Sequence, residues 1–406
     1  MAALVPLIRG NRNFRLLWFG QIVSQLGDWF NVVALVALLF ELTGSATAVA
    51  ALMVMQMLPV ALVGPVAGVI VDRFDRRRIM IAADLIRGLA VLTLLLVRTP
   101  DTVWIAYVAT GTMVACSGFF EPARSATVPS IVPREQLVAA NAISTGTWSA
   151  MLAIGAGLGG GVAAWLGRDA AFLINAASFL LSATFLLQMR VPRVMESARA
   201  ALGIRGVIDG LAYMRGHRDV ARIALIKGGW AIVGGALLLL TVFGDRIFRI
   251  GGSSDAGIGI LFSARGIGAL AGSLIVSAIA SRSGNLIRLI APAYFIAGAC
   301  YASLAIVPTI WVAAAAVVAA HVFGSILWVA SNVLLQMQVP DQFRGRVFAA
   351  ELIALALVQS TVAYVTGVAL DVWHADPRVL AALVGAGLWV PATFWSFHRS
   401  TAAGTR

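Results

Sequence analysis

The chain is poor in charge. Of its 406 residues only 12% are charged and 60% are hydrophobic, and the mean hydropathy is +0.91. Soluble domains carry roughly 25% charged residues, so the composition excludes an ordinary soluble protein, including a large all-α one whose helices would need charged outer faces. The net charge of +12 would suggest nucleic acid as the partner of a soluble protein. Here we attribute it to membrane topology and expect no nucleic-acid partner.

The chain is also poor in residues that carry chemistry. Its two cysteines, Cys116 and Cys300, lie inside apolar segments, and its four histidines have no metal-ligand spacing, so we expect neither a disulfide nor a metal site. It lacks a Gly-x-x-x-x-Gly-Lys-Ser/Thr phosphate loop and a serine, histidine and acid in a hydrolase-like context. We therefore expect neither an enzyme nor a bound cofactor. We also expect no cleaved signal peptide.

Long apolar segments dominate the chain, each close to the roughly 20 residues that span a bilayer. We predict twelve transmembrane helices, at residues 14–40, 46–71, 79–97, 102–120, 138–166, 170–189, 220–243, 256–280, 286–307, 309–336, 347–370 and 378–397. Basic residues mark the cytoplasmic side of such helices. With a cytoplasmic N-terminus, 22 of the 30 basic residues fall on that side and five on the other, and Arg87, Lys227 and Arg265 fall inside helices. Both termini are therefore expected in the cytoplasm.

The predicted helices form two sets of six. Residues 1–189 and 220–406 are the expected bundles, and residues 190–219 are a cytoplasmic linker. Apolar residues recur at helical spacing between Ile204 and Met214, which predicts an amphipathic helix on the membrane face. Val132-Pro133 after helix four recurs as Val339-Pro340 after helix ten, 207 residues later. We therefore predict an all-α integral membrane protein of two pseudo-symmetric six-helix bundles, as in secondary transporters whose substrate site lies between repeats.

The charged loop Gly68–Arg78 and several further segments carry a family resemblance. Gly68-x-x-x-Asp72-Arg73-x-x-Arg76-Arg77 resembles motif A of the major facilitator superfamily, with Asp75 where many members have glycine. Three further segments resemble the drug- and siderophore-efflux branch of this superfamily, which includes macrolide and enterobactin exporters. They are Ser24-x-x-Gly27-Asp28, Pro122-Ala123-Arg124 and Gln336-x-x-Val339-Pro340-x-x-x-Arg344-Gly345-Arg346-Val347. In helix five, Gly155-Ala156-Gly157-Leu158-Gly159-Gly160 resembles the end of the antiporter motif, with Ala156 replacing its proline. Export and simple tight packing both explain this run.

The resemblance implies a cytoplasmic gate. Asp72 would brace that gate against the start of helix eleven, and Arg73 would pair with Glu121 or Asp84. Gly68 is expected to add close packing at the helix end. The other predicted gate residues lie at the end of helix four and the start of helix eleven, and they are Glu121, Arg124, Arg346 and Glu351. The alternative is a loop that only sets topology, which explains the arginines but not its two aspartates or Gly68.

Asp28 is the predicted proton-coupling residue. A charge in the bilayer core costs about 2.5–3.5 kcal/mol, so such residues are functional candidates. Gln21, Ser24, Gln25 and Asp28 form one polar stripe along helix one, which we expect to face a wet cavity. A carboxylate there can exchange protons in each transport cycle. The alternative is a structural carboxylate that stays hydrogen-bonded to its helix neighbours.

Two cations complete the predicted substrate cavity. Lys227 is the only lysine and lies in helix seven, and Arg265 lies in helix eight. Two interpretations stay open: the cations bind an anionic group of the substrate, or they form ion pairs with Asp28 or another carboxylate. Helix ten adds a polar stripe. The predicted cavity residues are Gln21, Gln25, Lys227, Arg265, His321, Trp328 and Asn332.

The leading hypothesis is a secondary active transporter that exports an amphipathic small molecule, such as a drug or siderophore, by alternating access. A proton gradient would supply the energy, and the cargo would be anionic if the cations bind it. We expect a monomer in the lipid bilayer of the plasma or inner membrane. The alternative is a lysophospholipid transporter or lipid flippase on the same fold, and a receptor without transport is a third class.

Overall fold

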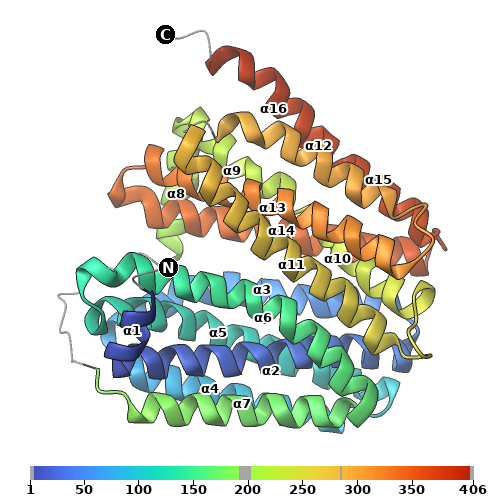
Figure 1. The fold of residues 1–406 in the computed structure, drawn as a ribbon, viewed down its shortest axis with the longest axis horizontal. Coiled ribbons are helices and arrows are strands. Elements are labelled where there is room, and N and C mark those ends of the chain that lie inside the picture. The colour runs from blue at the N-terminus through green and yellow to red at the C-terminus, as the bar shows by residue number, and fades with distance from the viewer. Residues whose placement is uncertain (1–3, 192–202, 284–285, 403–406) are drawn as a thin grey trace. The chain divides into compact units, whose positions relative to one another are not determined.

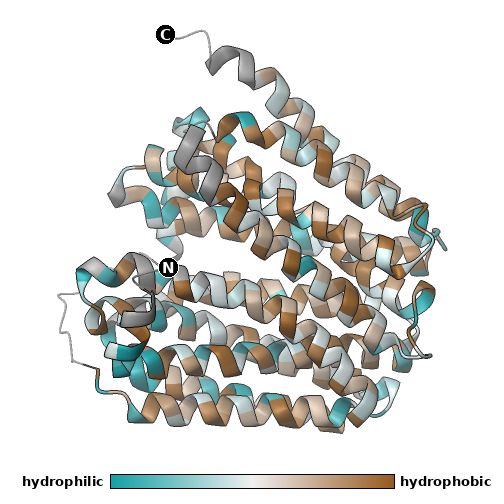
Figure 2. Cartoon of the chain, in the orientation of Figure 1, coloured by the Kyte–Doolittle hydropathy of each residue, from teal (hydrophilic) through white to brown (hydrophobic). Residues whose placement is uncertain are grey.

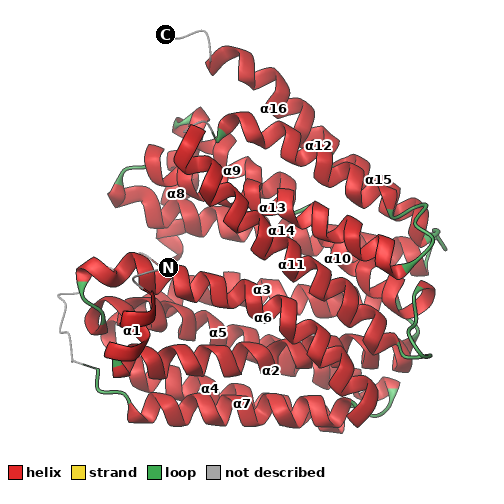
Figure 3. Cartoon of the chain, viewed as in Figure 1, coloured by secondary structure: helices red, strands yellow, loops and turns green. Residues whose placement is uncertain are grey.

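The computed structural model describes residues 4–191, 203–283 and 286–402, and these ranges are helices joined by short loops, without a β-strand (Figure 3). The first helices are α1 (Leu4–Gly10), α2 (Arg12–Thr43), α3 (Ala46–Arg73), α4 (Arg76–Thr93), α5 (Val103–Ile131), α6 (Leu137–Leu166) and α7 (Arg168–Gln188) (Figure 1). They are followed by α8 (Gly203–Gly216), α9 (Arg218–Trp230), α10 (Val233–Val242), α11 (Ser254–Ser283), α12 (Ile287–Ser303), α13 (Ile310–Gln338), α14 (Asp341–Asp371), α15 (Pro377–Gly387) and α16 (Trp389–Ala402). Short 3-10 segments occupy Leu94–Leu96, Pro100–Thr102 and Arg134–Gln136, and Phe243–Ile247 forms a π-helical turn.

The prediction of an all-α integral membrane protein is confirmed. In the described ranges, eleven helical segments are long and apolar enough to cross a membrane, and α12 adds a shorter apolar helix. Figure 2 shows apolar residues along the helices and hydrophilic residues gathered at many of the loops. A helix satisfies its own backbone hydrogen bonds, which is the condition for crossing the hydrocarbon region.

Several predicted helices differ from the observed ones. The segment 220–243 breaks at Ala231 into α9 and α10, and the segment 378–397 breaks at Leu388 into α15 and α16. The predicted end of helix four at residue 120 is wrong, because α5 continues to Ile131 through Pro122 and Pro129. Membrane helices tolerate proline because neighbouring groups satisfy the freed carbonyls.

The chain forms two compact units, the first from residues 1–43 and 55–206 and the second from residues 44–54 and 207–406. In the first unit α2 packs against α6 and α7, and α4 packs against α5 and α7. The glycine run of α6 makes the contact with α2: a Cβ at Gly159 would lie 2.7 Å from the Phe30 backbone, and one at Gly155 would lie 2.9 Å from Trp29. The tight packing predicted for this run is therefore confirmed, and it holds the helix that carries Asp28.

In the second unit α11 packs against α13, α12 packs against α13 and α15, and α10 packs against α14. The predicted linker helix is present as α8, and it docks on the start of α14. Asp209 of α8 lies 3.3 Å from Arg346, and the Tyr213 ring stacks on Phe343 with centroids 4.5 Å apart. Arg346 is therefore bound to the linker helix. The linker residues 192–202 lie outside the described ranges.

The first turn of α3 belongs to the second unit, because a carboxylate at the end of α14 holds it. Asp371 accepts hydrogen bonds from the backbone N–H groups of Ala46 at 3.0 Å and Thr47 at 2.7 Å, and from the Ser45 hydroxyl at 2.6 Å. Arg246 lies 4.0 Å from the same carboxylate. The first N–H groups of a helix have no partner within the helix, so Asp371 supplies the cap that α3 needs.

We predict that Asp371→Ala destabilises the protein, because it removes three accepted hydrogen bonds and a negative charge at a helix N-terminus. The expected loss is about 1–2 kcal/mol, measured as a lower thermal unfolding midpoint of the purified protein in detergent. Asp101→Ala is the matched control, since Asp101 is an exposed residue of the 3-10 segment Pro100–Thr102, and it should lower the midpoint much less. Equal midpoints for Asp371→Ala and the wild type would contradict the capping role.

Candidate functional site

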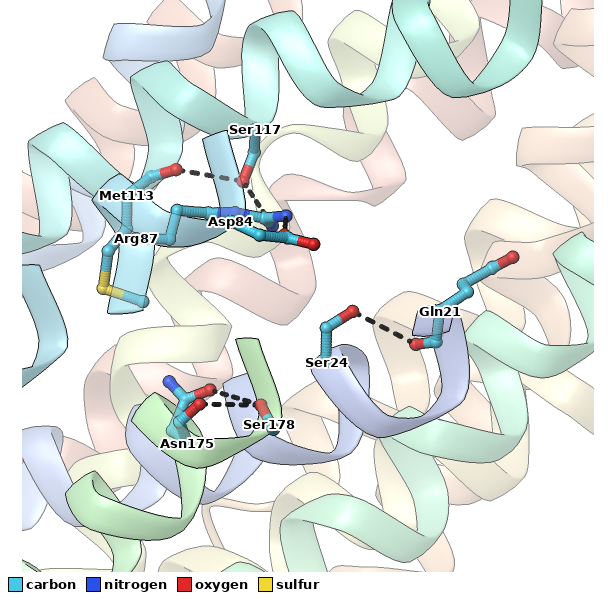
Figure 4. Close-up of polar contacts among 8 residues, drawn as sticks. All are labelled: Gln21, Ser24, Asp84, Arg87, Met113, Ser117, Asn175 and Ser178. Carbon is cyan, nitrogen blue, oxygen red and sulfur yellow. Dashed lines mark hydrogen bonds and ion pairs between the residues drawn. The ribbon is translucent and has the colours of Figure 1, made fainter. Parts of the chain in front are cut away.

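A buried ion pair lies within α4, inside the first unit. The Asp84 carboxylate accepts a hydrogen bond from the Arg87 guanidinium one turn further on, and the two side chains are 0% and 6% exposed. Figure 4 shows the pair beside Ser117 of α5. Burying two charges is unfavourable unless each has a close partner, so this pair is a defined structural unit of the α4 helix.

The guanidinium of Arg87 lies close to two aromatic rings. Its carbon lies 4.5 Å from the ring centroid of Phe120 on α5 and 4.5 Å from that of Phe179 on α7. Its Nη1 donates to the Ser117 hydroxyl at 3.3 Å, and that hydroxyl donates to the Met113 carbonyl at 3.0 Å (Figure 4). Both rings are within cation–π distance of the guanidinium, and its N–H groups make the hydrogen bonds to Asp84 and Ser117.

Asp28 and Arg87 line the same cavity, which has a volume of about 120 Å³. Helices α2, α3, α4 and α5 contribute its wall, which consists of Asp28, Asn31, Val32, Gln56, Arg87, Thr110, Met113, Val114 and Ser117. Asn175 of α7 and the charges of Arg87 and Asp84 act on the Asp28 carboxyl. The structure thus brings the predicted coupling residue next to a buried cation.

The rest of the predicted stripe on α2 makes other contacts. Gln21 is 5% exposed, donates to the Ser144 carbonyl at 3.1 Å and accepts from Arg124 at 3.5 Å. Arg124 also pairs with Glu121 at 2.8 Å, so the predicted gate residues of α5 contact the stripe through Gln21. The side-chain carbonyl oxygen of Gln25 is buried and has no hydrogen-bond partner in the described part of the chain.

The second unit holds its own buried ion pair. Lys227 Nζ of α9 lies 2.7 Å from Glu351 of α14, and their side chains are 7% and 2% exposed. The same nitrogen donates to Asn332 at 2.8 Å and lies 4.8 Å from the Trp328 ring centroid. Glu351 also accepts from Ser331 at 2.7 Å. Lys227 is thus paired with a carboxylate, and that carboxylate is Glu351, not Asp28.

This pairing corrects the predicted place of Glu351. The prediction put Glu351 with Arg346 at the cytoplasmic start of helix eleven, but Glu351 lies ten residues after Asp341, the first residue of α14. It is 3% exposed and belongs to the Lys227 cluster. The difference arises because α14 begins six residues before the predicted residue 347.

His321 and Arg265 lie near each other on α13 and α11. The His321 Nε2 and the Tyr301 hydroxyl are 2.7 Å apart and share a hydrogen bond, and the Trp230 ring meets the imidazole edge-on with centroids 5.7 Å apart. The Arg265 guanidinium carbon lies 5.9 Å from the Phe262 ring centroid. His321 is 7% exposed, which fits the lining, hydrogen-bonding interpretation of this residue.

The loop arginines of the predicted motif A bind helix ends. Arg76 donates to the Ala126 carbonyl of α5 at 2.8 Å, and Arg77 donates to the Leu186 carbonyl at the end of α7 at 2.7 Å. Asp75 caps α4 by accepting from a backbone N–H of its first turn. Cations near a helix C-terminus satisfy its last carbonyls, as Arg77 does for α7, so this loop ties the start of α4 to α5 and to the end of α7.

The predicted gate contacts of this loop involve Asp72, Arg73 and Gly68. The side chain of Asp72 lies outside the described part of the structure. Arg73 is exposed, and its two candidate partners have other arginines: Glu121 pairs with Arg124 and Asp84 with Arg87. A Cβ at Gly68 would meet no described atom within 4 Å, and close packing at this residue stays a prediction.

Arg87 and Asp84 are the residues that sequence reasoning missed as a site. The signal was present: two opposite charges at i and i+3 inside an apolar helix. Their rings and hydroxyl partners come from α5 and α7, far away in the sequence, and only the fold brings these together.

The sequence matches the family model described as transmembrane secretion effector over residues 1–391. Similar curated proteins include the uncharacterized MFS-type transporter YfiS of Bacillus subtilis, 27% identical over 365 residues and covering 85% of this chain and 84% of that protein. The multidrug efflux pump Tap of Mycolicibacterium fortuitum is 26% identical, with 82% and 83% covered. Macrolide efflux protein A of Streptococcus pyogenes is 28% identical, with 52% and 54% covered.

Solved transporter structures share the fold. A peptide transporter of the POT family in complex with sulfate superposes with a TM-score of 0.78 at 12% identity, covering 96% of this chain and 95% of that one. The nucleoside transporter NupG superposes with a TM-score of 0.76 at 12% identity, covering 95% and 98%. At this identity the likeness concerns the fold alone.

We predict that Lys227 and Glu351 stabilise the second unit only as a pair. Glu351→Gln or Lys227→Met leaves a buried charge without its partner, which costs about 3–5 kcal/mol. Each single variant should therefore show a much lower thermal unfolding midpoint and less monodisperse protein on size exclusion. The double variant removes both charges and should recover most of the loss. A double variant as unstable as the two single losses added together would refute the pairing.

Proposed function

Because the chain belongs to the transmembrane secretion effector family within the drug-efflux branch of the major facilitator superfamily, we propose that it exports an amphipathic small molecule, such as a drug or siderophore, in exchange for protons. Family membership makes it a multi-pass membrane transporter rather than an enzyme. The names of two relatives, macrolide efflux protein A and multidrug efflux pump Tap, support export as the direction and a small molecule as the cargo.

The observation that carries the proton coupling is the position of Asp28. It is a carboxyl group inside a membrane-spanning helix, it lines a cavity together with Asn31 and Arg87, and it is half-buried. A carboxylate in such surroundings is stabilised when it binds a proton, so it can take up and release one as its exposure to each side changes. The proton gradient then drives the cycle, and we propose no cofactor or metal for it.

We propose an amphipathic cargo, and we do not propose that Lys227 binds a charged group of it. The contacts of Lys227 with Glu351 and Asn332 favour the ion-pair interpretation over the binding of an anionic substrate. The substrate-cavity assignments of Gln21, Gln25, Arg265, His321, Trp328 and Asn332 stay proposals. Arg265 is half-buried and His321 is buried in the second unit, and they are the candidates to test first for an anionic group.

The mechanism we propose is alternating access by a monomer whose two six-helix bundles, residues 1–189 and 220–406, move about a site between them. The linker 190–219 and both termini would be cytoplasmic, in a plasma or inner membrane. Asp72, Arg73, Arg76 and Arg77 would then belong to the cytoplasmic gate. Labelling of single cysteines introduced at both termini by an impermeant reagent tests this orientation.

We predict that Asp28→Asn abolishes accumulation of cargo driven by a pH gradient. The assay uses the full chain in proteoliposomes and a panel of cationic and anionic amphiphiles that includes a macrolide. Exchange of labelled for unlabelled cargo without a gradient should persist, because it needs no net proton movement. Asp101→Asn, in the exposed 3-10 segment Pro100–Thr102, is the matched control and should transport like the wild type.

Wild-type rates in Asp28→Asn under an imposed gradient would remove Asp28 from the coupling role. Movement of a fluorescent lysophospholipid between the leaflets of the same vesicles, without transport of the amphiphile panel, would instead favour the lipid-transporter alternative. Both outcomes are distinguishable in one preparation, because the gradient and the cargo are varied independently.

A further inference from the structure

The cavity beside Asp28 has the size and lining of a water site. Its volume of about 120 Å³ is enough for several water molecules. Pockets for drug-sized ligands measure roughly 300–1,000 Å³, so this cavity is too small for the cargo. Three buried polar atoms of its lining residues have no hydrogen-bond partner within the described ranges, and they are Asn31 Oδ1, Thr110 Oγ1 and Arg87 Nε. Buried water binds atoms of this kind.

The charged groups around Asp28 come from two neighbouring helices. Helix α4 contributes Arg87 and Asp84, and α5 contributes Glu121, which is already paired with Arg124. Helix α7 contributes the neutral amide of Asn175. Asp28 and Asp84 therefore share one nearby cation, the Arg87 guanidinium.

The sharing of one cation by two carboxylates sets the charge balance. With Arg87 bonded to Asp84, an ionised Asp28 leaves one uncompensated negative charge in a medium of low dielectric, which is costly. A proton on Asp28 removes that charge. If Arg87 instead compensates Asp28, the proton can leave. The state of the α4 pair thus decides whether Asp28 is protonated.

We propose that Arg87 is a positioning residue for proton exchange at Asp28, and that the cavity between them holds the water through which the proton enters and leaves. This inference rests on the proposed function, in which Asp28 is the coupling carboxylate. In the release step the carboxyl O–H bond of Asp28 breaks and its proton passes to the oxygen of a cavity water. The electron pair stays on the carboxylate, and the Arg87 charge balances it.

The contacts around Arg87 make this role specific. The rings of Phe120 and Phe179 each lie 4.5 Å from the guanidinium carbon, and the guanidinium N–H groups donate to Asp84 and Ser117. A small movement of the guanidinium therefore changes how Arg87 divides its charge between two carboxylates without removing it from its aromatic partners. The Arg87 charge thus compensates Asp84 while Asp28 holds its proton, and it compensates Asp28 after the proton has left.

The test is an infrared titration of the full chain in nanodiscs, which follows the carbonyl stretch of protonated carboxyl groups. The band that disappears in Asp28→Asn identifies Asp28. We expect Asp84→Asn to move the midpoint of this band to lower pH by about one pH unit or more, because Arg87 is then free to compensate Asp28. Arg87→Gln should move it to higher pH by a similar amount. The two shifts have opposite signs.

A purely structural role for the pair predicts a different result. The Asp28 midpoint would then stay at its wild-type value in both variants, and that outcome would overturn the proposal. Arg98→Gln is the matched control for loss of an arginine, because Arg98 pairs with Asp169 in an exposed position, and it should leave the midpoint unchanged. Arg87→Lys, which keeps the charge, should bring the midpoint back close to its wild-type value.

Arg87→Gln leaves Asp84 buried without its partner and can fail to fold. The double variant Asp84→Asn with Arg87→Gln then replaces it, because it leaves neither charge of the pair. Compared with Asp84→Asn alone, its midpoint should rise by about one pH unit or more, and equal midpoints would refute the role of Arg87. The titration needs no transport, so its result stands even if gradient-driven transport, and with it the proposed function, fails.

Discussion

A charged side chain costs about 2.5–3.5 kcal/mol at the centre of a membrane-spanning helix. In this structure, oppositely charged side chains close to it offset that cost. Asp84 and Arg87 form the buried pair of the first unit, and Lys227 and Glu351 form that of the second. Aromatic rings lie against both cations. Asp28 differs, because the nearest cation already serves Asp84. That imbalance is what makes Asp28 the candidate for binding a proton.

Helix packing and helix capping hold the helices that carry these charged residues. Glycines of α6 bring that helix against the backbone of α2, the helix that carries Asp28. Helix ends are held by side chains from elsewhere, as where Arg77 binds the carbonyls at the end of α7 and Asp371 caps α3. Backbone groups must be satisfied before a helix can lie in a membrane. The charged loop thus has a local structural role, whatever part it plays in the gate.

The sequence predicted the helical class and most helix positions because apolar length and arginine placement are local properties. The sequence pattern did not predict the helix breaks at Ala231 and Leu388, because the apolar runs are continuous there. Lys227 and Glu351 lie 124 residues apart, so composition and spacing left the lysine's partner open. The Asp84–Arg87 pair was visible as an i and i+3 spacing, but its rings and the cavity with Asp28 arise only from tertiary packing.

The central claim is that cargo and protons move through this chain in exchange for each other. The most direct measurement is the internal pH of proteoliposomes during cargo movement, with no pH gradient imposed at the start. A cargo gradient should drive protons in the opposite direction, so a dye in the lumen should report a pH change that Asp28→Asn abolishes. Cargo that moves through the wild-type protein while the internal pH stays constant would contradict the account.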